Sequence, residues 1–277
     1  MHYNDIIRQN GILKRRLSPM KNIKIAFFDI DGTLIDMNTK VISKKTLEML
    51  ARLQKNNIKI CIATGRAPSS LPPIPDIAFD AYLTFNGSYC YSKKHVIFSN
   101  PLQPEDVTTI LQNAAELHRP VSIATRDRLS ANGKDEDLVQ YYKFSKSPFI
   151  IPENFEEITK EDIYQIMLGS CLEEHIPLMK NVKNARITYW WERAVDIIPK
   201  DGGKGVGVKK ILSYYNLTED EAIAFGDGNN DIELLQSVGL GVAMENASEQ
   251  LKAVAKDQCG HVAADGIYHY CMKHGLI

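Results

Sequence analysis

The sequence has no run of about 18 consecutive apolar residues, the length that a membrane-spanning helix needs. Its first residues also lack the apolar stretch of a secretory signal, so we expect a protein that neither spans a membrane nor is exported. The five cysteines are odd in number, scattered along the chain and never arranged as Cys-x-x-Cys. We therefore expect reduced thiols and a cytoplasmic location.

An excess of either charge is also missing, because 33 Lys and Arg stand against 34 Asp and Glu. Sequence-independent binding to nucleic acid depends on surplus Lys and Arg, so we expect no nucleic-acid partner. No internal repeat and no low-complexity segment occurs. The 44% of hydrophobic and 24% of charged residues are typical of an ordinary globular protein, and they exclude disorder, collagen and coiled coil as the main architecture.

The chain does contain short, nearly continuous apolar runs of the kind found in strands buried on both faces of a parallel sheet. Residues 23–30 and 58–63 are two such runs, and a helical pattern that begins at Ser43 separates them. Strand, helix, strand is the parallel crossover unit. We expect further strands and helices of this α/β type at 81–85, 205–215, 222–225, 231–238, 240–243 and 248–255. These patterns predict a doubly wound parallel sheet.

From Asn86 the pattern changes, with tyrosines, prolines and an irregular alternation of apolar and polar residues. We expect a hairpin near 89–100 and a helix from Pro104. A chain of 277 residues is about twice the commonest domain length, so room exists for a second unit. We expect an α+β cap domain inserted into the first domain. The expected division is an N-terminal extension at 1–20, a core at 21–85 and 194–277, and an insert at 86–193.

Two loops with paired acidic residues directly follow predicted strands. Asp29 and Asp31 come after the first strand, and two carboxylates there could divide nucleophilic attack and proton transfer between them. Residues 226–231, GDGNND, follow another strand and carry the hard oxygen ligands that Mg²⁺ takes. The alternatives are a plain polar turn at Asp31-Gly32 and an Asn/Gly-rich turn with caps. A calcium loop is the less favoured alternative, because the EF-hand spacing and its terminal Glu are missing.

Two further loops offer anion-binding groups. Thr64-Gly65-Arg66 follows the second strand, where a hydroxyl and amides at a helix start could bind phosphate, or Thr64 could simply cap that helix. Lys204 lies in a glycine-rich stretch that opens a helix, where it could neutralise phosphate or be an ordinary exposed lysine. The stretch matches neither a Walker loop nor a dinucleotide fingerprint. All four loops map to one edge of one sheet, which makes coincidence a poor explanation.

Taken together, DIDGTL, IATGR, the lysine of GGKGVGV, GDGNND, GVAMENA and ADGI resemble the haloacid dehalogenase superfamily of phosphohydrolases. The resemblance is closest to the Cof-type branch, similar to sugar phosphatases, and covers nearly everything after Met20. It implies a Rossmann-like core, an inserted α/β cap of the C2 type, and Mg²⁺ as cofactor. The order of the motifs, with the insert between the second and the third, implies that cap.

The resemblance also implies roles for individual residues. Asp29 would be the nucleophile that becomes aspartyl-phosphate, and Asp31 would protonate the leaving oxygen and then activate water. Mg²⁺ would be held by Asp29, the Asp31 carbonyl and Asp227, since carboxylate attack on phosphate otherwise meets like-charge repulsion. Asp231 would support Lys204 or the metal, and Arg66 would either form a salt bridge or contact phosphate. The residues that would contact phosphate or substrate are Ile30, Thr64, Gly65, Lys204 and Asn230.

The sequence thus predicts a monomeric, Mg²⁺-dependent phosphatase acting on small phosphorylated metabolites, with sugar phosphates as the first expectation. A phosphomutase of the same superfamily is the nearest alternative. A phospho-accepting signalling module is another, although Asp31 argues against it by favouring rapid dephosphorylation. A noncatalytic binder of sugar phosphates is the third.

Overall fold

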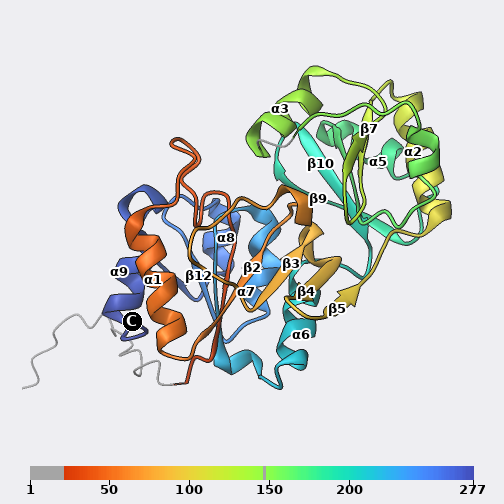
Figure 1. Cartoon of the computed structure of the whole chain (residues 1–277). Coiled ribbons are helices and arrows are strands. Elements are labelled where there is room, and N and C mark those ends of the chain that lie inside the picture. The colour runs from red at the N-terminus through yellow and green to blue at the C-terminus, as the bar shows by residue number, and fades with distance from the viewer. Residues whose placement is uncertain (1–21, 146–147) are drawn as a thin grey trace, which may run out of the picture.

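A computed structural model describes residues 22–145 and 148–277, so the expected extension at 1–20 lies outside the described residues. Two sheets organise the molecule, one with eight strands and one with five, and they form two lobes (Figure 1). No helix in the described part of the chain is long and apolar enough to cross a membrane.

The larger sheet has the strand order β13-β12-β11-β1-β2-β3-β4-β5. The strands from β13 to β3 are parallel, and β4 and β5 continue the sheet antiparallel. The central strands are buried on both faces, which explains their continuous apolar sequences. The parallel strands are β1 (Ile25–Phe28), β2 (Lys59–Ala63), β3 (Ala81–Thr84), β11 (Ala222–Gly226), β12 (Leu240–Ala243) and β13 (Asp257–Gln258).

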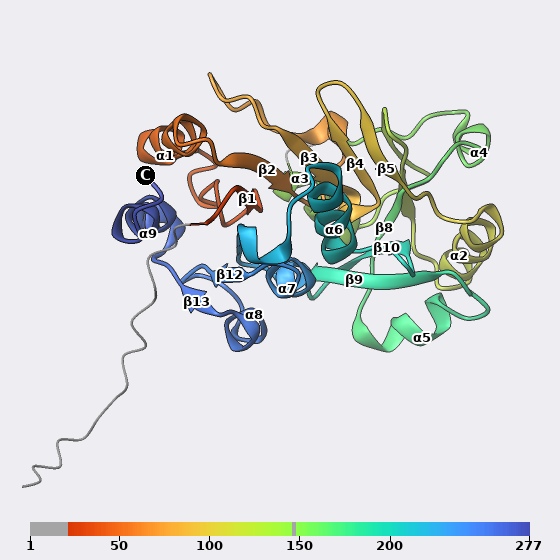
Figure 2. The ribbon, with the colours of Figure 1, turned by 90° about the horizontal axis from the view of Figure 1, so that it is seen from below.

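Helices cover both faces of this sheet, as Figure 2 shows. On one face lie α1 (Lys44–Lys55) and α9 (Gly266–Lys273), and on the other lie α6 (Lys204–Tyr214), α7 (Ile232–Gln236) and α8 (Glu249–Val254). Ser43 begins α1 as predicted, because its hydroxyl accepts a hydrogen bond from the Thr46 N–H. The prediction of a doubly wound α/β core is confirmed.

The smaller sheet is antiparallel throughout, in the order β7-β6-β8-β10-β9. It has a separate apolar core of its own. We call this sheet and its helices the cap. Its strands are β6 (Val121–Ala124), β7 (Leu129–Ala131), β8 (Gln165–Gly169), β9 (Ala185–Trp191) and β10 (Ala194–Pro199); its helices are α2 (Pro104–Glu116), α3 (Glu136–Ser145), α4 (Phe155–Ile158) and α5 (His175–Leu178).

Two segments near the expected domain boundaries lie in a different sheet from the one expected from sequence. The hairpin of β4 (Tyr89–Ser92) and β5 (Val96–Ser99) pairs with β3 and extends the larger sheet, although its alternation is typical of the antiparallel insert. An antiparallel edge on a parallel sheet is common, so the alternating sequence of this hairpin does not indicate which of the two sheets it joins. Strand β10 pairs with β8 in the cap instead of resuming the core. We propose that the inserted cap begins after Ser99 and ends after Pro199.

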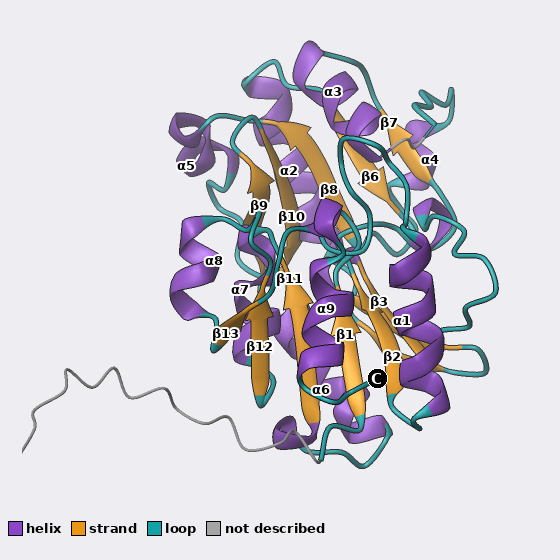
Figure 3. Ribbon diagram, turned by 90° about the vertical axis from the view of Figure 1, so that its left-hand side faces the viewer, coloured by secondary structure: helices purple, strands orange, loops and turns teal. Residues whose placement is uncertain are grey.

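The central position of β1 between β11 and β2 brings three chain segments together at one edge. The three strands are parallel, so the loops that follow Phe28, Ala63 and Gly226 leave the sheet on the same side. Figure 3 shows β1 and β11 side by side, with the cap strands β6 and β8 above them. The predicted phosphate and metal loops therefore face the cap.

Candidate active site

The loop after β1 makes a tight turn that also fixes the loop after β11. The N–H of Gly32 donates to the Ile35 carbonyl at 2.8 Å, and Gly32 has φ of 85°, in the left-handed region. A Cβ on Gly32 would lie 2.1 Å from Oδ2 of Asp227, so no larger residue fits. The hydroxyl of Thr33 donates to Oδ1 of Asp227 at 2.9 Å. The sequence analysis named Gly32 only in the alternative of a polar turn and assigned no role to Thr33, although both belong to the first motif.

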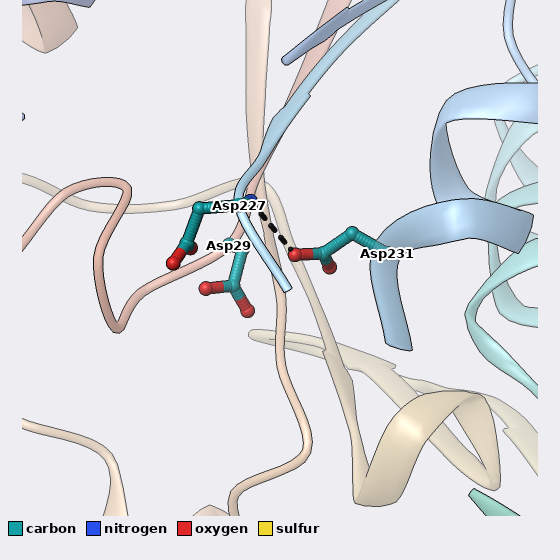
Figure 4. A group of neighbouring side chains, drawn as sticks. All are labelled: Asp29, Asp227 and Asp231. Atoms are coloured by element: carbon teal, nitrogen blue, oxygen red, sulfur yellow. Dashed lines mark hydrogen bonds between the residues drawn. The ribbon is translucent and has the colours of Figure 1, made fainter. Parts of the chain in front are cut away.

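Asp29, Asp227 and Asp231 form a carboxylate cluster in which one ligand oxygen of each lies within 4.8 Å of the others. Figure 4 shows the Asp29 and Asp227 side chains close together, with Asp231 reaching toward them from the short 3₁₀ turn Asn229–Asp231. The pKa of Asp29 is raised to about 7, first by burial and then by the charges of Asp231 and Asp31, against the attraction of Lys204. Burial and the charge of Asp29 likewise raise the pKa of Asp227.

Lys204, the first residue of α6, supplies a buried positive charge to this cluster. Its Nζ donates to Oδ1 of Asp29 at 2.7 Å and to Oδ1 of Asp231 at 2.5 Å. Burial alone would lower the pKa of Lys204, but the charges of Asp231 and Asp29 raise it above its ordinary value. The residue is 1% exposed, so the alternative of an ordinary exposed lysine is wrong.

These three carboxylates suit a small divalent cation. Their oxygens are hard ligands, and a cation would offset the repulsion between their buried negative charges. Asp231 has both oxygens in use, since Oδ1 accepts from Lys204 and Oδ2 accepts from the N–H groups of Asp227 and Gly228. Asp29 and Asp227 therefore offer the better placed carboxylate oxygens. Asp231 orients Lys204 and the loop after β11.

The loop after β2 differs in one respect from its prediction. No α-helix begins at Thr64; β2 ends at Ala63, and the chain passes into a 3₁₀ turn at Pro68–Ser70. The expected helix start at Thr64 is therefore wrong, because the chain takes an extended path at Ala67 before Pro68. The Thr64 hydroxyl oxygen accepts from the Arg66 N–H at 3.1 Å, which leaves the hydroxyl proton for another acceptor.

Arg66 pairs with Asp31 in a two-point ion pair. Its Nε and Nη2 donate to the two Asp31 carboxylate oxygens at 2.6 and 2.7 Å, and Nη1 donates to the Ser70 carbonyl at 3.1 Å. The salt bridge, one of the two roles that the sequence left open for Arg66, is present. This geometry fixes the orientation of the Asp31 carboxylate.

A buried polar network links Asn230 to the cap and was missed by sequence reasoning. Asn230 Nδ2 donates to Oδ1 of Asn86 at 3.1 Å, and Asn86 Nδ2 donates to Asp196 at 3.1 Å and to Gln165 Oε1 at 3.2 Å. The Tyr141 hydroxyl donates to Asp196 at 2.7 Å. Burial raises the pKa of Asp196 to about 6, against the hydrogen bonds from Tyr141 and Asn86.

A cavity of about 310 Å³ lies between the core and the cap and contains most of the predicted site. Ile30 does not line this cavity, and Lys204 and Asp231 reach it only through Asp29 and the loop after β11. The lining residues from the core are Asp29, Asp31, Met37, Thr64, Gly65, Arg66, Ala67, Ser70, Phe85, Asp227, Gly228 and Asn230, and those from the cap are Ala124, Leu129, Tyr141, Gln165 and Met167.

Comparisons with known proteins identify the family of the chain. A sequence profile of the haloacid dehalogenase-like hydrolases matches residues 26–271. YkrA of Bacillus subtilis, provisionally named a phosphatase, is 30% identical over 92% of this chain and 98% of its own. The HMP-PP phosphatase of Escherichia coli is 27% identical over 91% of this chain and 96% of its own. The solved structure of BT4131, titled a subclass IIB sugar phosphatase, has a TM-score of 0.83 at 29% identity, covering 92% and 100% of the two chains.

The profile spans the larger sheet and the cap, and the relatives match nearly their whole lengths. The resemblance found in the motifs is thus confirmed at the level of the entire chain. The chain belongs to the haloacid dehalogenase-like hydrolases, and within that family it is a phosphatase.

Proposed function

We propose that this protein is a Mg²⁺-dependent phosphatase that hydrolyses small phosphomonoesters through an aspartyl-phosphate on Asp29. The observation that carries the proposal is the placement of buried Lys204 between Asp29 and Asp231, next to Asp227 at the cavity. A cation beside a nucleophilic carboxylate offsets the repulsion that a phosphate dianion would meet. That arrangement suits phosphoryl transfer better than the binding of a neutral ligand.

The proposed reaction has two displacements at phosphorus. A carboxylate oxygen of Asp29 attacks phosphorus, the bond to the leaving oxygen breaks, and Asp31 gives that oxygen its proton. Water then attacks phosphorus, Asp31 takes the proton of the water, and the bond between Asp29 and phosphorus breaks to release phosphate. Thr64, the Gly65 amide and Asn230 would hold phosphate oxygens, because all three line the same cavity as Asp29.

Asp29, the Asp31 carbonyl and Asp227 would hold Mg²⁺. When bound, Mg²⁺ would supply positive charge that stabilises the negative charge on the phosphoryl oxygens. The raised pKa values of Asp29 and Asp227 support this assignment, because two buried carboxylates at this distance need a counter-charge beyond Lys204.

Sugar phosphates are the first substrate class expected from sequence, and the similarity to the sugar phosphatase BT4131 supports testing them. A small phosphorylated metabolite fits the size of the cavity. The expectations of a monomer, a cytoplasmic location, and no nucleic-acid or membrane partner stay predictions.

The test is phosphate release from a panel of sugar phosphates, nucleotides and cofactor phosphates, with Mg²⁺ and with a chelator. We expect Mg²⁺-dependent release in the wild type and a loss of roughly 10⁴-fold or more in Asp29→Asn. An unchanged melting temperature would show that the variant keeps its fold. Full turnover by Asp29→Asn would defeat the mechanism; an isomeric sugar phosphate as product would indicate a phosphomutase, and a long-lived phosphoprotein would indicate a signalling module.

A further inference from the structure

Asn86 lies where the chain turns from β3 into the hairpin of β4 and β5, and its backbone takes a conformation that few residues adopt. Its φ and ψ are 50° and 34°, in the left-handed region, and Phe85 before it has φ of 50° as well. Asparagine is one of the few residues with a side chain that enter this region readily. A strained turn persists only where its surroundings hold it, so it points to a functional constraint.

The loop after β2, which is expected to bind phosphate, holds this turn. The Phe85 N–H donates to the Arg66 carbonyl at 3.1 Å, and the Asn86 N–H donates to the Thr64 carbonyl at 3.0 Å. A Cβ on Gly65 would lie 3.0 Å from Asn86 Nδ2, so the Asn86 amide packs directly against Gly65. The turn and the loop are therefore joined on both sides of Gly65.

The side chain of Asn86 connects the cap to Asn230. Its Nδ2 donates to Asp196 at 3.1 Å and to Oε1 of Gln165 at 3.2 Å, and its Oδ1 accepts from Asn230 Nδ2 at 3.1 Å. Burial raises the pKa of Asp196 to about 6, so at pH 8 this side chain is a carboxylate, which can only accept hydrogen bonds. The cap thereby sets which end of the Asn86 amide is nitrogen, and it turns Oδ1 toward Asn230.

The same reasoning fixes the amide of Asn230, which lines the cavity. The Nδ2 of Asn230 carries two N–H groups, and Asn86 accepts from one of them, so the other stays a donor for a ligand. A reversed Asn86 would instead turn the Asn230 oxygen toward the phosphoryl oxygens, which would repel it. Asn86 itself is 1% exposed, and both its nitrogen and its oxygen are engaged. Asn86 is therefore placed to act through Asn230 and not on a substrate directly.

We propose that Asn86 is a positioning residue, which passes the orientation set by Asp196 of the cap on to Asn230, so that Asn230 presents a donor to the phosphoryl oxygens. This inference rests on the proposed phosphatase function, in which Asn230 contacts phosphate. The phosphoryl oxygens are common to all substrates of the enzyme. Loss of the Asn86 side chain should therefore lower kcat/KM by the same factor for every ester, whatever its leaving group.

The variant Asn86→Gly removes the side chain and suits the left-handed backbone. At pH 8 we expect it to lower kcat/KM about tenfold or more, as for a lost hydrogen bond to a charged group, and equally for sugar phosphates, nucleotides and cofactor phosphates. In an Asn230→Ala background the same change should lower kcat/KM by less than about twofold, because no amide is left to orient, while the melting temperature should fall in both backgrounds. An equal loss of kcat/KM in both backgrounds, or a loss that varies with the leaving group, would overturn the inference.

A swapped variant, Asn86→Asp with Asp196→Asn, exchanges donor and acceptor between the two positions and keeps the net charge. It retains an oxygen for Asn230, and aspartate also tolerates the left-handed backbone. We expect it to restore kcat/KM to within about threefold of the wild type. A loss of about tenfold or more in the swapped variant would contradict the inference, even where Asn86→Gly fails to fold. The wild type tests the proposed function separately, because release of phosphate from none of the esters would overturn that function.

Discussion

The core and the cap contribute opposite chemistry to the same cavity. The core supplies charge: Asp29, Asp227 and Lys204 are held at the ends of parallel strands and at a helix start, and each is fixed by hydrogen bonds or ion pairs. The cap supplies uncharged side chains, among them Gln165 and Met167. We therefore expect changes in the core to affect the reaction step and changes in the cap to affect the choice of leaving group, so that each should alter a different kinetic quantity.

Lys204→Met should have the largest effect on this comparison, because it leaves two buried carboxylates without their cation. We expect a loss in kcat of about 10²- to 10³-fold. We also expect a fall of about 3–5 kcal/mol in the free energy of unfolding, as when one partner of a buried ion pair is removed. Phosphate release and urea unfolding measure the two effects.

Lys209→Met is the matched control, because Lys209 lies on the same helix and is exposed. It should change the free energy of unfolding by less than about 0.5 kcal/mol and should change kcat by no more than the factor that this energy corresponds to. A Lys204→Met protein with normal kcat would show that the core charge does not drive the reaction.

The core site could be predicted from sequence because its residues lie in short motifs next to recognisable strands. Buried parallel strands are continuous apolar runs, and Asp29, Thr64 and Asp227 follow directly after such runs. The cap network could not be predicted, since Asn86, Tyr141, Gln165 and Asp196 come from four separate elements and no motif joins them. The sheet that each boundary strand joins could not be predicted for a similar reason: the pairing partners of β4, β5 and β10 depend on the whole sheet, whereas their sequences indicate only strands.

The pH dependence of stability tests the buried network between core and cap. The folded-state pKa of Asp196, about 6, lies above its ordinary value of 3.8, so the folded protein binds this proton more tightly than the unfolded chain. The stability contributed by the protonated form is therefore lost as pH rises from about 4 to 6. Relative to Asp196→Asn, the wild type should lose about 3 kcal/mol of unfolding free energy over this window and then level off.

Urea unfolding of the two proteins between pH 4 and 8 measures this difference, and the other titrating carboxylates cancel in the subtraction. A difference that does not change with pH would show that Asp196 is not held in the buried environment described here.

The ion pair between Arg186 of β9 and Glu233 of α7 should give the smallest effect. Arg186 Nη2 donates to the two Glu233 oxygens at 2.8 and 2.9 Å, but the side chains are 31% and 45% exposed. We expect Arg186→Ala to cost about 1 kcal/mol or less in stability. A double-mutant cycle with Glu233→Gln isolates the pair, and a coupling well above that value would mean that cap and core are locked together more tightly than an exposed pair allows.

The stereochemical course at phosphorus tests the central claim most directly. A phosphorothioate monoester that carries sulfur, oxygen-16 and oxygen-18 on phosphorus would be hydrolysed in water labelled with oxygen-17. The released thiophosphate then bears sulfur and three different oxygen isotopes, so its configuration can be determined. Two in-line displacements, first by Asp29 and then by water, each invert phosphorus, so the account predicts net retention. Net inversion would mean that water attacks the ester directly, and it would contradict a covalent intermediate on Asp29.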